Sequence, residues 1–496
     1  MAKITHTITD FQETGITNNL RGSSGAGMIK HFDNRNKGKL QPYRDTTATE
    51  TKSLLIGKFA LAPLIGSPTG AIIWGLGVSS TNPAIYYSSN GTSWSTPSNN
   101  SGSTGAVDYS SFIFYKDYLY CYENGTIIGR FGTISGGSPT YGTFQTLNTA
   151  FNNPAQSVHH PADDTLYFAT DNRIHKLNDA AWTEDALVLP SDVYITSMTP
   201  FGNYLAIAVA PLSTVGHSTV YLWDRDSGLS TISQKIDWGE GKCFAIGEIN
   251  GLLVGVTNEY LNHAFDEDIS RLVVRASSGS TSRITNFLEA DDSNINSGGG
   301  GVLGDADSLV TNEKMYFYAS LLQRGEQNSG IWAVDERGRF TLEFVEEDNT
   351  PTTGENGITS FMNQANRWWF AHSDDGSVSR TTSTALYTYT SVYETRIFSA
   401  KEMTDWVDLV GATVKTEALP TAGQIVLQFK ADEDTSWTTM ATFTTDDAVL
   451  HSITKSASAT APDVSKEIQF RIESTGGAVV TGFQVTLDEI NKQPYA

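Results

Sequence analysis

The fold is indicated by one recurring kind of stretch, seen most clearly in NRWWFAHSDDGSVSR, residues 366–380. Apolar and aromatic residues lead into Asp-Asp-Gly, and an alternating polar and apolar run follows. The Asp-Gly pair supplies the positive φ angles that a tight turn between two twisted strands requires. The stretch therefore predicts a β-hairpin.

The same sequence pattern recurs along the chain. Two copies carry the turn directly, residues 117–125 and 164–172, and three have a longer loop before it, residues 203–207, 250–255 and 313–318. With a similar run at 70–74, their central apolar residues are Ile73, Leu119, Leu166, Leu205, Leu253, Met315 and Trp368. These markers lie roughly 50 residues apart on average, which is typical of one four-stranded blade in a radial β-array. They predict a β-propeller of about seven blades. Six or eight blades remain alternatives, because the glycine turns fall at different positions in the repeated pattern.

Composition agrees with an all-β fold. The chain has 496 residues, of which 39% are hydrophobic and 11% aromatic. Such a length predicts two or three domains unless repeats absorb it. Abundant Thr, Ser, Gly, Tyr and Phe favour strands and turns, and no long stretch repeats its apolar residues with the helical period of about 3.6.

Charge and motifs exclude several classes of function. A net charge of −22 argues against a free-standing nucleic-acid binder, because affinity for phosphate comes mainly from Lys and Arg. The glycine run at 297–301 is not followed by Gly-Lys-Ser/Thr, so it does not predict a phosphate cradle. No nucleophile elbow or zinc spacing occurs either. We expect no cofactor and no enzymatic activity.

Two cysteines, Cys121 and Cys243, lie in apolar runs of different predicted blades, which predicts buried free thiols. The first residues contain no signal-peptide core, and no window approaches the roughly 18 apolar residues of a membrane span. We expect synthesis in a cytoplasm and no membrane span.

The first 50 residues differ from the rest in being polar and locally basic. Such a segment buries too little apolar surface to fold alone, so residues 1–50 are expected to form an extended N-terminal arm. The arm either wraps its own propeller or docks on the acidic body of a neighbouring subunit. The residues expected to carry that docking are Lys30, Arg35, Lys37, Lys39 and Arg44.

Residues 51–390 are assigned to the propeller and residues 391–496 to a separate domain. In the latter, short runs of period 2 recur at intervals of about 10 to 15 residues, which predicts a small antiparallel β-sandwich. The runs lie at 409–414, 425–430, 436–440, 468–473 and 480–485.

At these residues the chain resembles a known group of proteins. The segment after Tyr393, with VLQFK at 426–430 and EIQFRI at 467–472, is similar to the β-sandwich that follows a propeller in many tailed-bacteriophage virion proteins. The opening, with KHFD at 30–33 and LQPYR at 40–44, resembles the starts of those proteins. Size and order resemble the tail hub, or packaged-DNA stabilisation protein, of short-tailed phages. The resemblance implies a structural subunit of a closed, sixfold ring that contacts portal, adaptor or other tail proteins and lets genome DNA pass.

Several candidate sites favour a structural interpretation. His159-His160 with Asp163-Asp164 is the densest potential metal cluster, but adjacent strand residues point to opposite faces. Acidic runs at 266–268, 346–348 and 432–434 lack the spacing of a calcium loop. A shortened Asp-box at 86–94 would cap a turn rather than bind a ligand. We therefore expect no metal site and no catalytic residue.

Two other functions stay open. A receptor-binding or carbohydrate-binding propeller, such as a phage adhesin, would present aromatic residues on exposed loops, with Trp94 and Trp182 as candidates. A propeller glycosidase would need two carboxylates at a set separation, which the sequence offers no way to pair.

Overall fold

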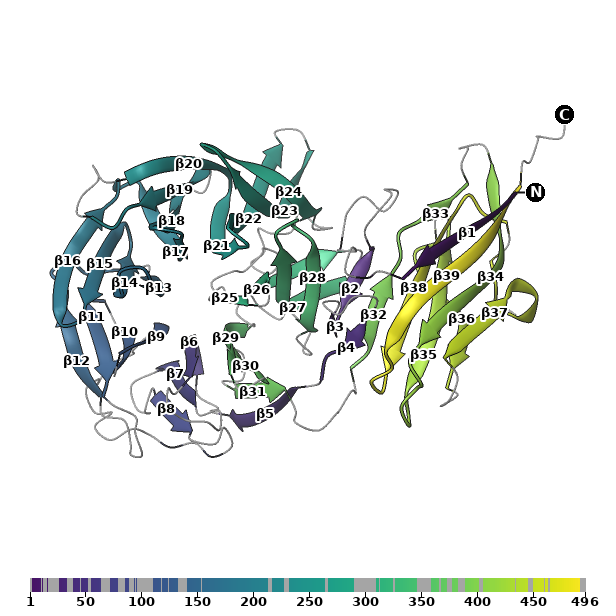
Figure 1. Ribbon diagram of the computed structural model, residues 1–496, viewed down its shortest axis with the longest axis horizontal. Coiled ribbons are helices and arrows are strands. Elements are labelled where there is room, and N and C mark those ends of the chain that lie inside the picture. The colour runs from purple at the N-terminus through teal and green to yellow at the C-terminus, as the bar shows by residue number, and fades with distance from the viewer. Residues whose placement is uncertain are drawn as a thin grey trace. The chain divides into compact units, whose positions relative to one another are not determined.

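The chain is described by a computed structural model, drawn as a ribbon in Figure 1. It describes residues 2–9, 11, 16, 26–33, 39–44, 46–51, 55–63, 72–78, 85–88, 93, 95, 110–116, 118–123, 125–132, 141–152, 154–212, 216–226, 232–263, 266–289, 309–311, 313–323, 326–345, 358–364, 367–372, 377–381, 389–400, 405–432, 434–444, 449–458, 460–462 and 464–490. In these residues the regular structure is β-strand, apart from one turn of 3₁₀ helix, Lys455–Ala457. The fold is therefore all-β, as expected.

The chain divides into two compact units. One comprises residues 46–338 and 346–381, and the other residues 1–45, 339–345 and 382–496. The boundaries expected from the sequence, 1–50, 51–390 and 391–496, differ from these units. Residues 339–345 and 382–390, expected in the propeller, belong to the same unit as the C-terminal residues, and residues 46–50, expected in the arm, belong to the first unit. Residues 1–45 belong to the same compact unit as the C-terminal residues, rather than standing apart as an arm.

The first unit, which we call the propeller unit, is a succession of small antiparallel sheets. Their strands are β6 (Leu55–Pro63), β7 (Ile72–Val78) and β8 (Ile85–Ser88); β9 (Ser110–Tyr115), β10 (Tyr118–Glu123), β11 (Ile127–Phe131) and β12 (Tyr141–Thr146); β13 (Pro154–His160), β14 (Thr165–Thr170), β15 (Arg173–Asn178) and β16 (Ala181–Val188); β17 (Val193–Phe201), β18 (Tyr204–Pro211), β19 (His217–Trp223) and β20 (Ile232–Glu240); β21 (Lys242–Ile249), β22 (Leu252–His263), β23 (Asp266–Ser278) and β24 (Thr281–Glu289); β25 (Leu309–Thr311), β26 (Lys314–Gln323) and β27 (Glu326–Asp335); and β29 (Ile358–Gln364), β30 (Arg367–His372), β31 (Ser377–Thr381) and β5 (Thr46–Thr51).

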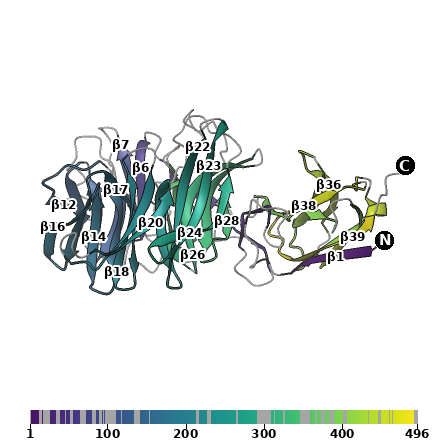
Figure 2. The ribbon, with the colours of Figure 1, turned by 90° about the horizontal axis from the view of Figure 1, so that it is seen from above.

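These sheets follow one another around a common centre, which makes the unit a β-propeller (Figure 1). Two neighbouring sheets are also joined by a parallel pair between β20 and β24, Asp237 with Thr281. The first strands of the sheets lie innermost (Figure 1). They pack in succession from β6 through β9, β13, β17 and β21 to β25, and β29 packs against β6. Turned by 90°, the same sheets are seen side by side, with their strands running from one face of the ring to the other (Figure 2). The last sheet takes its outer strand, β5, from the N-terminal side of the unit.

The hairpin predicted at residues 366–380 is confirmed, with Phe370 opposite Ser379 in the pairing of β30 with β31. The marker residues fall on the second strands β7, β10, β14, β18, β22, β26 and β30. Those whose side chains are described are all buried: Leu119, Leu166, Leu205, Leu253, Met315 and Trp368. The repeated sequence pattern therefore marks the second strand of each sheet, which is buried and can be recognised because it is apolar on both faces.

Apolar side chains between consecutive sheets form the core. One cluster joins Tyr122 of β10 to Phe168 of β14, a second joins Tyr167 of β14 to Trp223 of β19, and a third joins Leu222 to Leu253 of β22. The Tyr167 and Trp223 rings meet edge to face at 5.8 Å. A single twisted sheet cannot cover both its faces, and stacking around a centre lets each sheet bury the next.

The second unit, which we call the terminal unit, contains two larger sheets. One has the order β1 (Ala2–Ile8), β39 (Val480–Ile490), β34 (Trp406–Thr416) and β37 (Leu450–Thr454). The other has the order β28 (Phe340–Val345), β2 (Met28–Lys30), β32 (Ser391–Glu394), β38 (Glu467–Thr475), β35 (Gln424–Ala431) and β36 (Thr438–Phe443), with β33 (Phe398–Ser399) also on β38 and a short pair, β3 (Phe32–Asp33) with β4 (Gln41–Pro42), beside it. Each strand expected after Tyr393 occurs, with bounds shifted by a few residues at most of their ends. Phe470 of β38 and Phe483 of β39 pack at 5.4 Å, which joins the two sheets.

Candidate functional site

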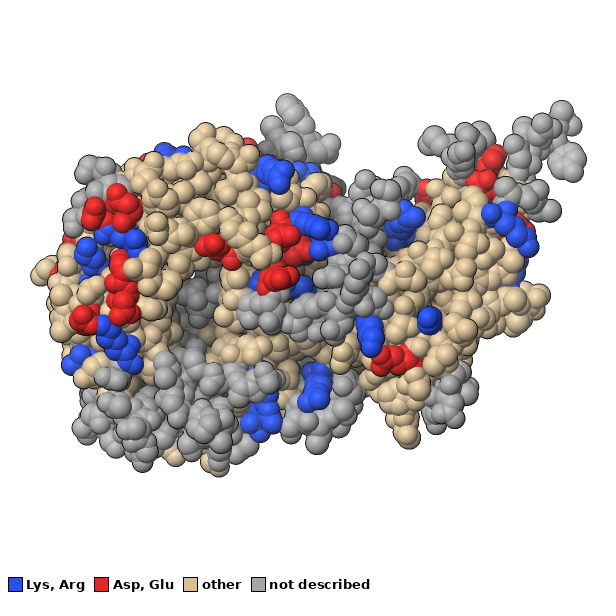
Figure 3. Space-filling view, viewed as in Figure 1, with Lys and Arg blue, Asp and Glu red and all other residues tan. Residues whose placement is uncertain are grey.

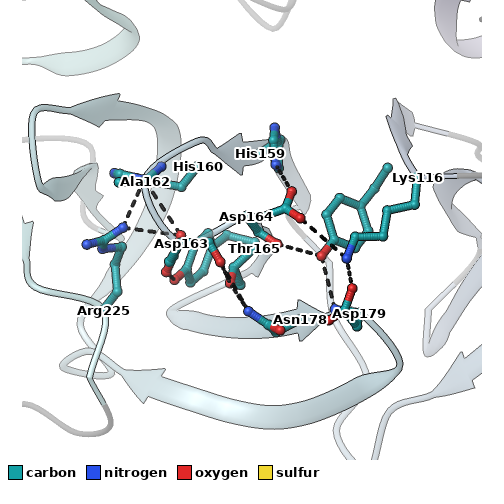
Figure 4. Close-up of polar contacts among 12 residues, drawn as sticks. Lys116, His159, His160, Ala162, Asp163, Asp164, Thr165, Asn178, Asp179 and Arg225 are labelled. Atoms are coloured by element: carbon teal, nitrogen blue, oxygen red, sulfur yellow. Dashed lines mark hydrogen bonds and ion pairs between the residues drawn. The ribbon is translucent and has the colours of Figure 1, made fainter.

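The His and Asp cluster singled out in the sequence lies at the turn between β13 and β14 (Figure 4). Asp164 has φ +48°, a left-handed conformation that aspartate tolerates in tight turns. The turn lies next to residues of the preceding sheet, Tyr115 and Lys116, and of the following sheet, Tyr204 and Arg225. The cluster is therefore a junction of three neighbouring sheets.

His160 is fully buried and hydrogen-bonded at both ring nitrogens. Its Nε2 lies 3.0 Å from the carbonyl oxygen of Tyr204, which can only accept, so Nε2 carries the hydrogen. Its Nδ1 accepts from the Ala162 amide at 3.2 Å and faces Nη1 of Arg225 at 2.9 Å. Burial lowers the pKa of His160, with the Arg225 charge acting in the same direction. The ring is thus held neutral, in one tautomer.

Asp163 lies beside His160 and binds groups from its own and the following sheet. Its Oδ1 is 3.2 Å from Nη1 of Arg225, and its Oδ2 accepts the Tyr167 hydroxyl at 2.7 Å. Burial, followed by this hydrogen bond, raises the pKa of the Tyr167 hydroxyl. The backbone carbonyl of Asp163 accepts a hydrogen bond from the side-chain amide of Asn178 at 3.1 Å. The carboxylate is therefore committed to contacts within the chain.

Asp164 fastens the other side of the turn to the preceding sheet. Its carboxylate lies 2.9 Å from Nε2 of His159 and 3.3 Å from Nζ of Lys116. The hydrogen bond from His159, then the Lys116 ammonium, hold the pKa of Asp164 below its usual value. The Tyr115 hydroxyl donates to the Asp164 carbonyl at 2.5 Å and accepts from the Asp179 amide at 3.0 Å. Lys116 also pairs with the Asp179 carboxylate.

The cluster is not arranged as a metal centre. His160 is buried whereas His159 is partly exposed, and the two rings bind different partners. In the part of the chain that the structure describes, no group of three or more His, Cys, Asp or Glu side chains is placed to hold a metal ion. The paired charges of this cluster instead join neighbouring sheets.

The acidic run at 432–434 also has local partners. Oδ1 of Asp432 accepts from the amides of Lys466 at 2.7 Å and Glu467 at 3.1 Å, and Oδ2 of Asp434 accepts from the Ala431 amide at 3.1 Å. The two carboxylates therefore stabilise turns. The run at 346–348, Asp374, the glycine run at 297–301 and Asn90 of the shortened Asp-box lie outside the described residues, as do the side chains of 266–268.

Three of the basic residues expected on the arm, Lys30, Lys39 and Arg44, lie within the described residues. Lys30 belongs to β2, paired with Val392 of β32, and Lys39 forms an ion pair with Glu417 of its own unit. Arg44 is exposed, and Arg35 and Lys37 lie outside the described residues. Lys39 thus has a partner within its own chain, and its docking on a neighbouring subunit stays a prediction.

Trp182, a candidate for an exposed aromatic residue in the receptor-binding alternative, is half-buried and packs against the core between two sheets. It belongs to β16, stacks on His175 at 5.7 Å and packs against Phe144 and Phe168. Trp94 lies outside the described residues.

One buried ion pair was not predicted from the sequence. It joins Arg275 of β23 to Glu259 of β22. Nη1 of Arg275 also lies 3.4 Å from the hydroxyl of Ser282, which donates to the Trp238 carbonyl of the preceding sheet at 2.6 Å. A charged residue inside an otherwise apolar strand, as in LVVRA at 272–276, is the only signal that could have indicated it.

Both cysteines are buried free thiols, as expected. Burial raises the pKa of the Cys243 thiol to about 12, so it stays protonated and unreactive at neutral pH. Figure 3 shows acidic and basic side chains as neighbours on the face of the molecule that it presents, with uncharged surface between them. No helix in the described residues is long and apolar enough to cross a membrane.

Comparisons with known proteins give no family. No protein-family description matches the chain, and no characterised protein matches it by sequence. Among solved structures, it is similar to BBS1N in complex with ARL6DN (12% identity, 70% of this chain and 98% of that chain covered, TM-score 0.42). It is also similar to YCF48 bound to D1 peptide (11%, 72% and 98%, TM-score 0.42) and to a glycoside hydrolase (12%, 88% and 99%, TM-score 0.29). At these TM-scores the likenesses carry no argument about function, and the fold rests on the strand pairing described above.

Proposed function

We propose that the protein is a structural subunit of a tailed-bacteriophage virion, part of a closed ring at the tail through which genome DNA passes. The proposal rests on the contacts made by the charged cluster at the turn between β13 and β14. Arg225, Asp163, Asp164 and Lys116 are engaged in tying neighbouring sheets together. Such a junction supports a rigid load-bearing body, and the resemblance of the terminal segments to virion proteins supplies the setting.

The finer architecture forms part of this proposal. The seven successive sheets of the propeller unit would be seven blades. Its last blade would be closed by β5, which binds the N-terminal side of the unit to its C-terminal side. The two sheets of the terminal unit, joined by Phe470 and Phe483, would be a β-sandwich. Closing the last blade with a strand from the other end stabilises a ring of blades against opening.

The distribution of charge favours passage of DNA through the assembly rather than binding of DNA by one subunit. The innermost strands β6, β9, β13, β17, β21, β25 and β29 contain, of Lys, Arg, Asp and Glu, only Lys58, Lys242 and Glu248. The innermost strands therefore contribute almost no net charge. The net charge of −22 lies mostly elsewhere, and on a channel between subunits it would repel phosphate.

The partners in this proposal are identical subunits in a sixfold ring, with portal, adaptor or other tail proteins above and below. The protein would be made in the host cytoplasm and would end in the virion. It would have no cofactor and no catalytic role. Polysaccharides and sialosides incubated with the purified protein should not be turned over above a heat-treated control, and reproducible turnover would favour the glycosidase alternative.

Electron microscopy of the purified protein tests the ring directly. We expect closed rings, with sixfold symmetry in class averages and a native mass six times that of one chain. Added portal-containing particles should bind these rings at a single vertex. A monomer at every concentration, with no binding to such particles, would contradict the proposal.

A further inference from the structure

The first strand of the chain forms the edge of a sheet made by its last strands. β1 pairs antiparallel with β39 along its whole length, from Ala2 opposite Glu489 to Ile8 opposite Phe483. In the order β1, β39, β34, β37, it is the outermost strand on that side. Both ribbon views show β1 beside β39 (Figures 1 and 2).

The pairing combines backbone and side-chain contacts. Among residues 3–9 none is buried, and exposed and half-buried positions alternate along the strand. The half-buried positions lie directly opposite three residues of β39 that are buried, Phe483, Val485 and Leu487. Removing β1 would therefore uncover one side of this apolar row and would leave the hydrogen-bonding edge of β39 open. An open edge of this kind is a template for a strand from another chain.

The tether of the strand is short and firmly anchored. Only two residues separate Ile8 from Phe11, whose ring is fully buried and meets Tyr393 edge to face at 5.1 Å. A short connection between an exchangeable strand and a fixed anchor favours exchange, because a small change in the connection redirects the whole strand. The anchor stays in its own subunit while the strand can pair elsewhere.

We propose that β1 is exchanged between neighbouring copies of this chain, so that residues 2–8 of one subunit complete the β39 edge of the next. This inference rests on the proposed ring and names its contact. A ring needs a heterologous interface made of two different surfaces, and β1 with the β39 edge supplies both. The occupant of the edge is defined by the chain itself, since the register of β1 on β39 is already complementary.

Cysteine pairs distinguish exchange from pairing within one chain. Thr5 lies opposite Thr486, with their hydroxyl oxygens 3.5 Å apart. Thr5→Cys and Thr486→Cys are placed in separate chains of different mass, produced together in one cell, and oxidised. Exchange predicts a disulfide-linked dimer of unequal mass in the assembled fraction. The native cysteines do not interfere, because both are buried.

The same sheet offers a matched control. Thr413 of β34 lies opposite Ser452 of β37, with hydroxyl oxygens 2.9 Å apart, and neither strand is proposed to exchange. Thr413→Cys and Ser452→Cys in separate chains should give no linked dimer, whereas both in one chain should link internally. This control measures the background of disulfides formed between chains by collision.

The outcomes separate the two proposals. A Thr5–Thr486 link between chains, above that control, supports exchange. If the double variant links only internally while the unlinked protein has the mass of a closed ring, exchange is wrong and the ring stands. If only internal links form and the protein is a monomer at every concentration, both proposals are wrong.

Discussion

Nη1 of Arg225 lies 2.9 Å from Nδ1 of His160, so a guanidinium of one sheet donates to a buried imidazole of the sheet before it. Since arginine can only donate, this contact requires His160 to be neutral, with its hydrogen on Nε2. The same Nη1 contacts the Asp163 carboxylate at 3.2 Å. One side chain thus sets a tautomer and pairs a charge at the junction between two sheets.

Arg225→Met should destabilise the propeller unit by about 1 to 3 kcal/mol, because the largely buried Asp163 Oδ1 loses its charged partner. The effect is measured by chemical unfolding. In a double-mutant cycle with Asp163→Asn, we expect a coupling free energy above roughly 0.5 kcal/mol. Arg283→Met, at an exposed position, is the control and should change stability by less than about 0.5 kcal/mol. Equal effects of the two arginine changes would refute the role of Arg225.

Acid should destabilise the protein through His175. This buried ring donates from Nε2 to the Thr170 hydroxyl at 2.8 Å and accepts the Asp185 amide at 3.1 Å. Burial lowers its pKa from 6.5 to about 4, despite the nearby Asp185 and Glu184 carboxylates. Because the unfolded chain takes up the proton first, the stabilisation is complete above pH 6.5 and is lost as the pH falls toward 4. The loss is on the order of 3 kcal/mol.

The check on His175 is the difference in unfolding free energy between neutral pH and about pH 4.5, where most of this loss is expected. His175→Gln should flatten that dependence relative to the natural protein. His217→Gln, at an exposed histidine paired with Asp237, should leave the greater part of it in place. If both variants keep the full pH dependence, His175 is not its source.

Two glycines with similar backbone angles should respond differently to alanine. Gly241 has φ +86°, and a Cβ there would lie 2.0 Å from the Asn258 carbonyl oxygen; Gly251 has φ +80° and open space around it. Backbone strain costs both about 1 kcal/mol, and the clash adds roughly 1 to 3 kcal/mol at Gly241 alone. Thermal unfolding of Gly241→Ala and Gly251→Ala measures the difference. Equal melting temperatures would show that β21 and β22 can separate at no cost.

The ion pair of Lys39 with Glu417 should contribute little to stability. Its side chains are 45% and 47% exposed, so Lys39→Ala should cost less than about 1 kcal/mol. Lys39→Glu should break the ion pair, because it places two carboxylates side by side. Adding Glu417→Lys should restore an ion pair with the charges exchanged. If ring assembly is lost in Lys39→Glu and is not regained in the double variant, Lys39 contacts another subunit instead.

Hairpins and their burial could be predicted from the sequence because they are local. A turn such as Asp171-Asn172 brings β14 and β15 together as soon as it forms, and an apolar run such as LYFA at 166–169 must be buried wherever its sheet lies. The free thiols followed from the same reasoning. The residues of the polar junction were predicted in part, since His159, His160, Asp163 and Asp164 are adjacent in the chain.

By itself, the sequence determined an all-β chain of repeated hairpins with buried second strands. Only the tertiary structure decided that Arg225 completes the junction of Asp163 and His160, that Trp182 packs against the core, and that β1 and β5 complete distant sheets. The reason is that period-2 patterning specifies which face of a strand is buried, and carries no information about which distant edge will pair with it. That choice is made by the edges that remain open once the local hairpins have packed.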